Sequence, residues 1–74
     1  MAQAEVTRSG HAILAATPWD QGGRRILCHL PTNDYTPFVV WYETRDRVTV
    51  SGHYCRTGLE AFELFRRYEH AAVA

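Results

Sequence analysis

Residues 57–72, TGLEAFELFRRYEHAA, carry the strongest structural signal in the chain. Apolar side chains recur there at helical spacing, and charged side chains fill the opposite side of the predicted helix. Thr57 and Glu60 have the spacing of a capping box, in which the hydroxyl accepts a hydrogen bond from a free amide of the first turn. We therefore expect an amphipathic C-terminal helix lying on a sheet. Its apolar stripe consists of Ala61, Leu64, Phe65, Tyr68 and Ala72.

The segments before this helix have the composition of β-strands. Residues 38–42, FVVWY, are β-branched and aromatic throughout, and residues 47–55 alternate between the two faces of a strand. Shorter apolar runs at residues 10–17 and 24–30 are bounded by proline and glycine, which favours two further strands. The simplest architecture is α+β, a four-stranded antiparallel meander with the helix packed on one face. The sequence leaves open the order in which the first two strands pair.

Alternation predicts which side of the last strand meets the helix. Val48 and Val50 fall on one face of this strand, with polar residues on the other. We expect Phe65 and Tyr68 to anchor the helix against these two valines or their strand neighbours. Gly52 lies within the same strand and indicates a bulge or a close packing approach.

The chain has 74 residues, enough for one small domain. We expect residues 10–74 to form this domain, and residues 1–9, which are small and polar apart from Val6, to be a flexible N-terminal segment. The sequence has no apolar run long enough to cross a membrane and no secretory signal, which predicts a cytoplasmic protein. In the cytoplasm Cys28 and Cys55 are expected to be reduced, buried thiols rather than a disulfide.

Cysteine and histidine occur together twice, as Cys28-His29 and as His53-x-Cys55. Adjacent residues of a strand point to opposite faces, so at most one of Cys28 and His29 can join the other pair, and a fourth zinc ligand is missing. His53 and Cys55 are about 6–7 Å apart along a strand, which is wide for a nucleophile and its base. We therefore expect no metal, no cofactor and no enzymatic activity.

Charge separates two kinds of binding function. Eight arginines and eight acidic residues give a net charge of zero, and lysine is absent. Nucleic-acid-binding domains usually carry a positive excess, because neutralising phosphates supplies much of their affinity. Here Asp20, Glu43 and Asp46 are close in sequence to the loop arginines, a mixture that suits a protein partner with charges of both signs. Nucleic acid is therefore the less expected partner.

Tryptophan, tyrosine and arginine are the residue types enriched at the energetic centres of protein interfaces. Trp19 lies in a polar, glycine-rich loop, and Trp41 is either a core residue or an interface residue. A sheet with one helix also leaves its second face to be covered, by a homodimer or by a larger partner. The predicted partner-binding residues are Trp19, Arg24, Arg25, Trp41, Arg45 and Arg47.

The stretch from Pro37 to Tyr68 contains FVVW at residues 38–41, GHY at 52–54 and EAFE at 60–63. In these segments the chain resembles small uncharacterised proteins carried by phages and plasmids. The resemblance covers under half of the chain and contains no catalytic motif. It implies an accessory protein of a mobile element, of the kind that inhibits a host machine stoichiometrically, as anti-CRISPR proteins do.

The sequence thus predicts a small, non-enzymatic protein-binding module, a phage-encoded inhibitor of a host protein or protein complex in the host cytoplasm. The alternative is a β-sheet module that binds single-stranded nucleic acid, with a homodimer pooling its arginines. Charge geometry discriminates between the two hypotheses. Arginines clustered on one face favour nucleic acid, whereas intermingled acidic and basic residues favour a protein partner.

Overall fold

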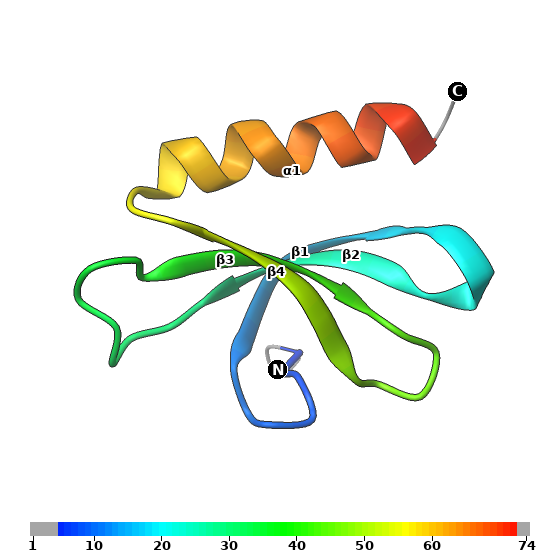
Figure 1. Cartoon of the computed structure of the whole chain (residues 1–74), viewed down its shortest axis with the longest axis horizontal. Helices are drawn as coiled ribbons and strands as arrows, with labels where there is room; N and C mark the ends of the chain where they lie inside the picture. Colours follow the sequence, from blue (N-terminus) through cyan, green and yellow to red (C-terminus); the bar gives the residue numbers. More distant parts are fainter. Residues whose placement is uncertain (1–4, 73–74) are drawn as a thin grey trace.

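The strands pair in the order in which they follow one another along the chain (Figure 1). The computed structural model describes residues 5–72. The predicted α+β architecture, an antiparallel meander with a C-terminal helix packed on it, is confirmed. A short 3-10 helix, η1 (Asp20–Gly22), lies between the first two strands. The other elements are β1 (Ala12–Pro18), β2 (Arg24–His29), β3 (Phe38–Glu43), β4 (Thr49–Cys55) and α1 (Gly58–Ala72).

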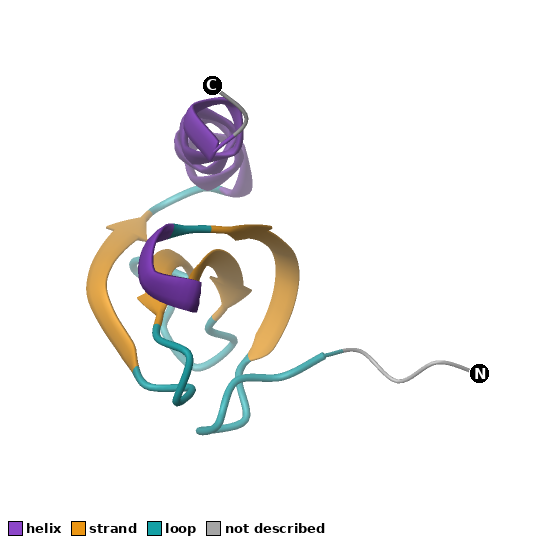
Figure 2. Cartoon of the chain, turned by 90° about the vertical axis from the view of Figure 1, so that its right-hand side faces the viewer, coloured by secondary structure: helices purple, strands orange, loops and turns teal. Residues whose placement is uncertain are grey.

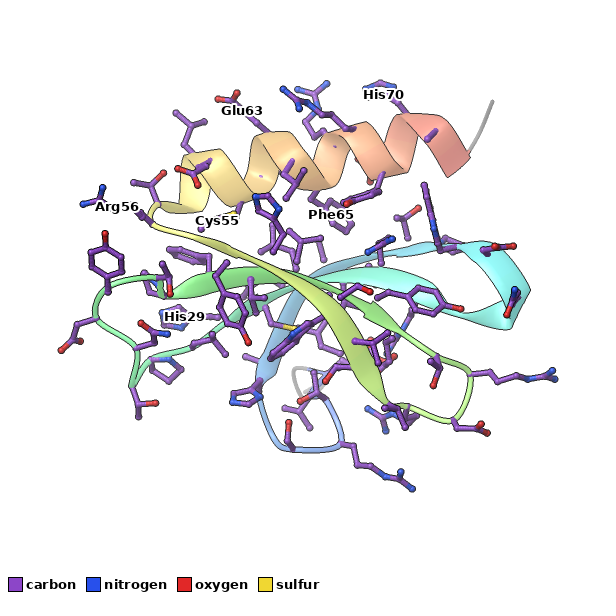
Figure 3. The ribbon with its side chains drawn as sticks, in the orientation of Figure 1. His29, Cys55, Arg56, Glu63, Phe65 and His70 are labelled. Carbon is purple, nitrogen blue, oxygen red and sulfur yellow. The ribbon has the colours of Figure 1, made fainter. Side chains whose placement is uncertain are left out.

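Helix α1 begins where the capping box predicts. The Thr57 hydroxyl accepts a hydrogen bond from the Glu60 amide at 3.1 Å, and so satisfies one of the free donors of the first turn. Phe65 points from the helix toward the sheet, whereas Glu63 and His70 point away from it (Figure 3). The helix therefore buries Ala61 and Phe65 of its apolar stripe, with Leu64 and Tyr68 partly buried beside them.

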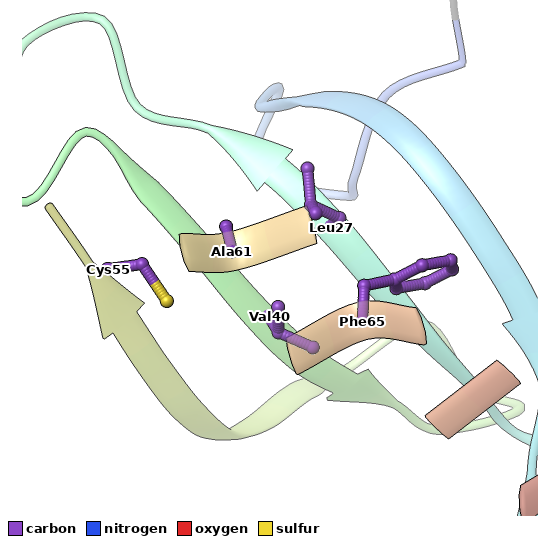
Figure 4. Close-up of a cluster of buried hydrophobic side chains, with 5 residues drawn as sticks. All are labelled: Leu27, Val40, Cys55, Ala61 and Phe65. Carbon is purple, nitrogen blue, oxygen red and sulfur yellow. The ribbon is translucent and has the colours of Figure 1, made fainter. Parts of the chain in front are cut away.

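The core beneath α1 is formed by the two central strands together with Cys55, the last residue of the edge strand β4. Phe65 is only 2% exposed and belongs to a buried cluster (Figure 4). Burial of a phenylalanine in a cluster of this kind contributes several kcal/mol of stability. The other members of the cluster are Leu27, Val40, Cys55 and Ala61.

Of the two predicted contacts of the helix, the one with Val48 and Val50 is wrong, whereas Phe65 and Tyr68 do pack on their strand neighbours, among them Val40 of β3. The side chains of Val48 and Val50 are 46% and 40% exposed. The register between β3 and β4 shifts between Val40 and Tyr42, and Ser51 has a left-handed φ of 54°, so β4 contains the irregularity that Gly52 indicated. A bulge bends its strand and changes the direction of the flanking side chains, so simple alternation fails across it.

The face of the sheet opposite α1 is also buried. Ile26, Cys28 and Val39 are 0% exposed, although they lie on the side that the helix does not cover. The sheet is strongly curled, and strands on both sides of it bend away from α1 (Figure 2). Leu30, itself buried, completes this second cluster, and Ile13 and Trp41 pack against it. The expectation that a partner must cover the second face therefore does not hold.

The segment before β1 packs against the sheet, which differs from the flexible segment expected at residues 1–9. Val6 forms a β-bridge with Ala12, and the Ile13 amide donates to the Glu5 carbonyl at 2.9 Å. Thr7 is 2% exposed, and its hydroxyl accepts a hydrogen bond from the His11 amide at 3.0 Å. Residues 5–9 are thus part of the folded unit, and residues 1–4 lie outside the described residues.

Over residues 5–72, α1 falls short of the length and apolar character that a membrane-spanning helix requires.

Candidate functional site

Strand β2 places the adjacent residues Arg24 and Arg25 on opposite faces of the sheet. Arg24 pairs with Glu43 across the sheet, on the face away from α1, and Arg25 pairs with Tyr42 on the helix side. Both arginines were predicted as contacts of one partner surface, whereas β2 directs them to opposite faces of the sheet. Their surroundings differ accordingly.

Glu43 is the centre of an ionic network on the face away from α1. Its side chain is only 3% exposed, and its Oε1 atom accepts a hydrogen bond from Arg24 Nε at 2.6 Å. Arg24 Nη2 also donates to Glu5 Oε2 at 2.7 Å. Arg47 Nε lies 3.7 Å from the second oxygen of Glu43, and its Nη2 atom donates to the Val6 carbonyl. Acidic and basic groups therefore alternate through this network.

The hydrogen bonds within this network change the pKa values of Arg24 and Glu5. The pKa of Arg24 is raised, first by its hydrogen bond to Glu5 and further by Glu43. The pKa of Glu5 is lowered, chiefly by the same hydrogen bond from Arg24. Arg24 is consequently engaged by two carboxylates and is not available to bind a further anion strongly.

A cleft of about 290 Å³ opens beside this network, between the loop that joins β1 to β2 and the turn that joins β3 to β4. We call it the acid–arginine cleft. The Oε2 atom of Glu43 is buried in its wall and has no hydrogen-bond partner among the described residues. Arg45, which is exposed, extends over Gly22 of the opposite loop. The lining residues are Glu5, Gly22, Gly23, Arg24, Glu43, Thr44, Arg45 and Arg47.

On the helix side, Arg25 is enclosed by three aromatic rings. Its guanidinium carbon lies 5.4 Å from the centre of the Trp19 ring, 5.5 Å from that of Tyr42 and 4.4 Å from that of Tyr68. Trp19 in turn packs edge-on against Tyr68, with 5.2 Å between ring centres. Cation–π contacts of this kind are worth about 0.5–2 kcal/mol each. Trp19 and Arg25, both predicted as partner contacts, thus pack the η1 loop against Tyr68 of α1.

Trp41 packs on the buried face of the curled sheet. Its ring centre lies 5.5 Å from that of His11 and 6.3 Å from that of Tyr54. Gly52 approaches it so closely that an added Cβ atom would lie 2.6 Å from Trp41 Nε1. Trp41 therefore belongs to the rim of the second core cluster.

Of the predicted residues, the structure brings Arg24, Arg45 and Arg47 together at the acid–arginine cleft. Sequence reasoning missed Glu5 as part of this site, and it treated Glu43 only as one of several loop acids. The signal that could have identified Glu43 is its position at the end of β3, opposite Arg24 in the antiparallel register. That register depends on how two strands pair, which no local pattern specifies.

The two cysteines are free, and both are buried, as expected. They belong to different core clusters on opposite faces of the sheet, which prevents a disulfide between them. Burial raises the pKa of the Cys28 thiol to about 12, and it also raises the pKa of Cys55, with a further contribution from Glu60. Within residues 5–72 there is no group of three or more His, Cys, Asp or Glu side chains arranged to hold a metal ion.

Comparison of the chain with protein-family models, curated proteins and solved structures gives no match.

Proposed function

We propose that this chain is a non-enzymatic protein-binding module that contacts its partner through the acid–arginine cleft. The observation that carries the proposal is the sharing of the buried carboxylate of Glu43 between Arg24 and Arg47. The cleft therefore presents charges of both signs in fixed positions. Such a pattern complements a protein surface, where acidic and basic side chains also occur together.

The alternative, binding of single-stranded nucleic acid, requires arginines that are free to neutralise phosphates. Arg24 is occupied by Glu5 and Glu43, and Arg47 donates to a backbone carbonyl. A phosphate backbone brought to this surface would meet the two carboxylates as well as the arginines. The intermingled charges therefore favour a protein partner.

A stoichiometric inhibitor of a host protein or protein complex is the form of this function that we propose. The chain is small, and its resemblance to proteins of phages and plasmids supports an accessory role in a mobile element. Inhibition by occupancy needs a contact surface and no catalytic groups, which fits a cleft lined by arginine, glutamate, threonine and glycine.

The proposal is tested by affinity capture from cells of the natural source, with nuclease treatment of the extract. Arg45→Glu reverses a charge at the rim of the cleft, and Arg67→Glu makes the same change at an exposed position of α1. We expect one protein to be retained in stoichiometric amount by the wild type and by Arg67→Glu, and to be lost from Arg45→Glu.

The second test of the proposal measures binding of labelled single-stranded oligonucleotides by fluorescence anisotropy. We expect dissociation constants of about 10⁻⁴ M or weaker at physiological salt, the range of non-specific binding. Micromolar binding that weakens steeply as salt rises, together with loss of the captured protein after nuclease treatment, would replace our proposal with the nucleic-acid alternative.

A further inference from the structure

Two groups in the acid–arginine cleft have unused capacity for binding. The Oε2 atom of Glu43 belongs to a side chain that is 97% buried and has no hydrogen-bond donor within the described residues. The guanidinium of Arg45 is exposed at the cleft rim and forms no ion pair there with residues 5–72. The cleft therefore offers one strong acceptor in its wall and a planar set of donors at its mouth.

Arg47 lines the same cleft as Arg45 and is an ion-pair partner of Glu43. Its Nε atom is 3.7 Å from Glu43 Oε2, which is within ion-pair range but too long for a hydrogen bond. Its side chain is half exposed. A ligand that displaces this long contact of the half-exposed Arg47 side chain would reach Glu43 Oε2, and it could use donors of Arg47 and of Arg45, which line the same cleft.

We infer that the cleft binds an acidic peptide segment of the partner protein, an inference that rests on the function proposed above. A carboxylate of the segment accepts hydrogen bonds from Arg45 and Arg47, and a backbone N–H of the same segment donates to Glu43 Oε2. Arginine suits the first contact because its guanidinium can hold a carboxylate with two parallel hydrogen bonds. A charge-assisted bond to Glu43 supplies the second.

The donor requirement separates a peptide backbone from a phosphodiester backbone. A phosphodiester offers only acceptor oxygens, so it could satisfy the arginines but would leave Glu43 Oε2 unpaired and facing a second negative charge. A peptide unit carries a donor and, in an acidic residue, an acceptor a few bonds away. The cleft volume of about 290 Å³ is near the lower limit for ligand pockets and suits one side chain with its adjoining peptide groups.

The probe for a test is hexaglutamate with blocked ends, titrated into the ¹⁵N-labelled full chain and followed by NMR. Arginine Nε–H groups and the amides of Gly22 and Gly23 report directly on the cleft. We expect saturable shifts at these groups and at Arg45 and Arg47. The matched control probe is the same peptide with N-methylated peptide bonds, which keeps every carboxylate but removes the donors, and it should bind about tenfold more weakly or worse.

Two protein variants locate the site. Arg45→Ala should abolish the shifts, while Arg67→Ala, which removes the same charge from the exposed side of α1, should leave the affinity within about twofold. An oligothymidylate of equal charge should bind more weakly than the peptide.

The inference is overturned if hexaglutamate does not bind, if N-methylation does not weaken it, if both variants lose affinity equally, or if the oligothymidylate binds as tightly. Because the capture experiment uses the natural partner, it can succeed when this titration fails. In that case the protein-binding function stands and the acidic-segment specificity does not.

Discussion

Gly52 lies against the indole ring of Trp41, where a larger residue has no room. An added Cβ atom would stand 2.6 Å from Trp41 Nε1 and 2.8 Å from its Cδ1. Trp41 packs on the second core cluster, so it cannot move aside freely. We predict that Gly52→Ala lowers the free energy of unfolding by about 1–3 kcal/mol, the usual cost of overpacking. Urea denaturation followed by far-UV circular dichroism measures this loss.

Gly58→Ala is the matched control for this prediction. An added Cβ at Gly58, the first residue of α1, would lie 3.4 Å from the nearest atom of the Phe38 ring, an ordinary contact distance. Alanine also favours the helix over the unfolded chain by up to about 1 kcal/mol. We expect this variant to be neutral or stabilised. An equal loss in both variants would show that the contact with Trp41 is not the cause.

Cys28 makes stability depend on pH on the alkaline side. Burial raises its pKa from 9.0 to about 12, so the folded state resists ionisation that the unfolded state allows. The stability that this thiol contributes is complete below pH 9 and is lost as the pH rises toward 12. We predict that unfolding under reducing conditions becomes easier in this range, by up to about 1.4 kcal/mol per pH unit from this thiol.

The difference between wild type and Cys28→Ala isolates this effect, because the two proteins share every other ionisable group. The alanine variant should lose stability less steeply as the pH rises, whatever its stability at neutral pH. Parallel pH profiles for the two proteins would contradict the assigned pKa. A thiol reagent should likewise label Cys28 only after denaturation.

At the scale of elements, α1 is held by one side chain more than by any other. Phe65 is 2% exposed and packs with Leu27 and Val40 of the central strands. We predict that Phe65→Ala costs about 3–5 kcal/mol, which in a domain of this size removes most of the stability. Thermal and urea unfolding monitored by circular dichroism provide the measurement.

Phe62→Ala supplies the comparison on the same helix. Phe62 is 51% exposed and contacts Arg66, whose guanidinium carbon lies 5.8 Å from its ring centre. Its replacement should change the free energy of unfolding by no more than about 0.5 kcal/mol. A cooperative, stable Phe65→Ala protein, or an equally damaged Phe62→Ala protein, would mean that the helix rests on the sheet by another face.

Elements of regular periodicity were predictable from sequence, and irregular ones were not. The helix cap at Thr57 and the strand at residues 38–42 follow from local patterns that the structure keeps. The exposure of Val48 and Val50 follows from a bulge in β4: Gly52 indicated an irregularity there, but the left-handed φ of Ser51 and its effect on the flanking side chains could not be predicted from the local pattern. Residues 5–9 pack because of the β-bridge from Val6 to Ala12 and the hydrogen bond from the Ile13 amide to the Glu5 carbonyl, contacts between segments that a polar composition does not indicate.

The candidate site was predictable only in part, for a similar reason. Composition identified Arg45 and Arg47 as residues of a binding surface, and both line the cleft. Glu5 and Glu43 are 38 positions apart in the sequence and meet only through Arg24. Such a network depends on the register of three segments, so residue types alone could not reveal which arginines are paired.

At the scale of the whole molecule, the structure changes the expectation for self-association. The sequence suggested a homodimer because one helix covers only one face of the sheet and leaves the other face exposed to water. Here the chain covers that face itself, through the curl of the sheet and the packing of residues 5–9, and Ile26, Cys28 and Val39 are 0% exposed. Burying this face therefore gives no driving force for pairing.

The edges of the sheet offer little for pairing as well. The start of β1 is bridged by Val6, and β4 is interrupted by the bulge at Ser51, a feature that discourages edge-to-edge association. A stable dimer usually buries about 1,200 Å² or more. The large exposed apolar side chains are distributed over β1, β4, α1 and the connecting segments, with no more than two on any one helix or strand, such as Val50 and Tyr54 on β4.

We therefore predict that the protein is a monomer of 8.5 kDa from micromolar to submillimolar concentration. Sedimentation velocity across this range, in low and in physiological salt, measures the mass directly. A concentration-dependent dimer would contradict the prediction, and it would also restore the route by which arginines of two copies could be pooled against a phosphate backbone. A monomer leaves each acid–arginine cleft to act alone, with Arg24 and Arg47 already paired with Glu5 or Glu43. Affinity must then come from groups that satisfy donors and acceptors together, which a peptide can do and a phosphodiester backbone cannot.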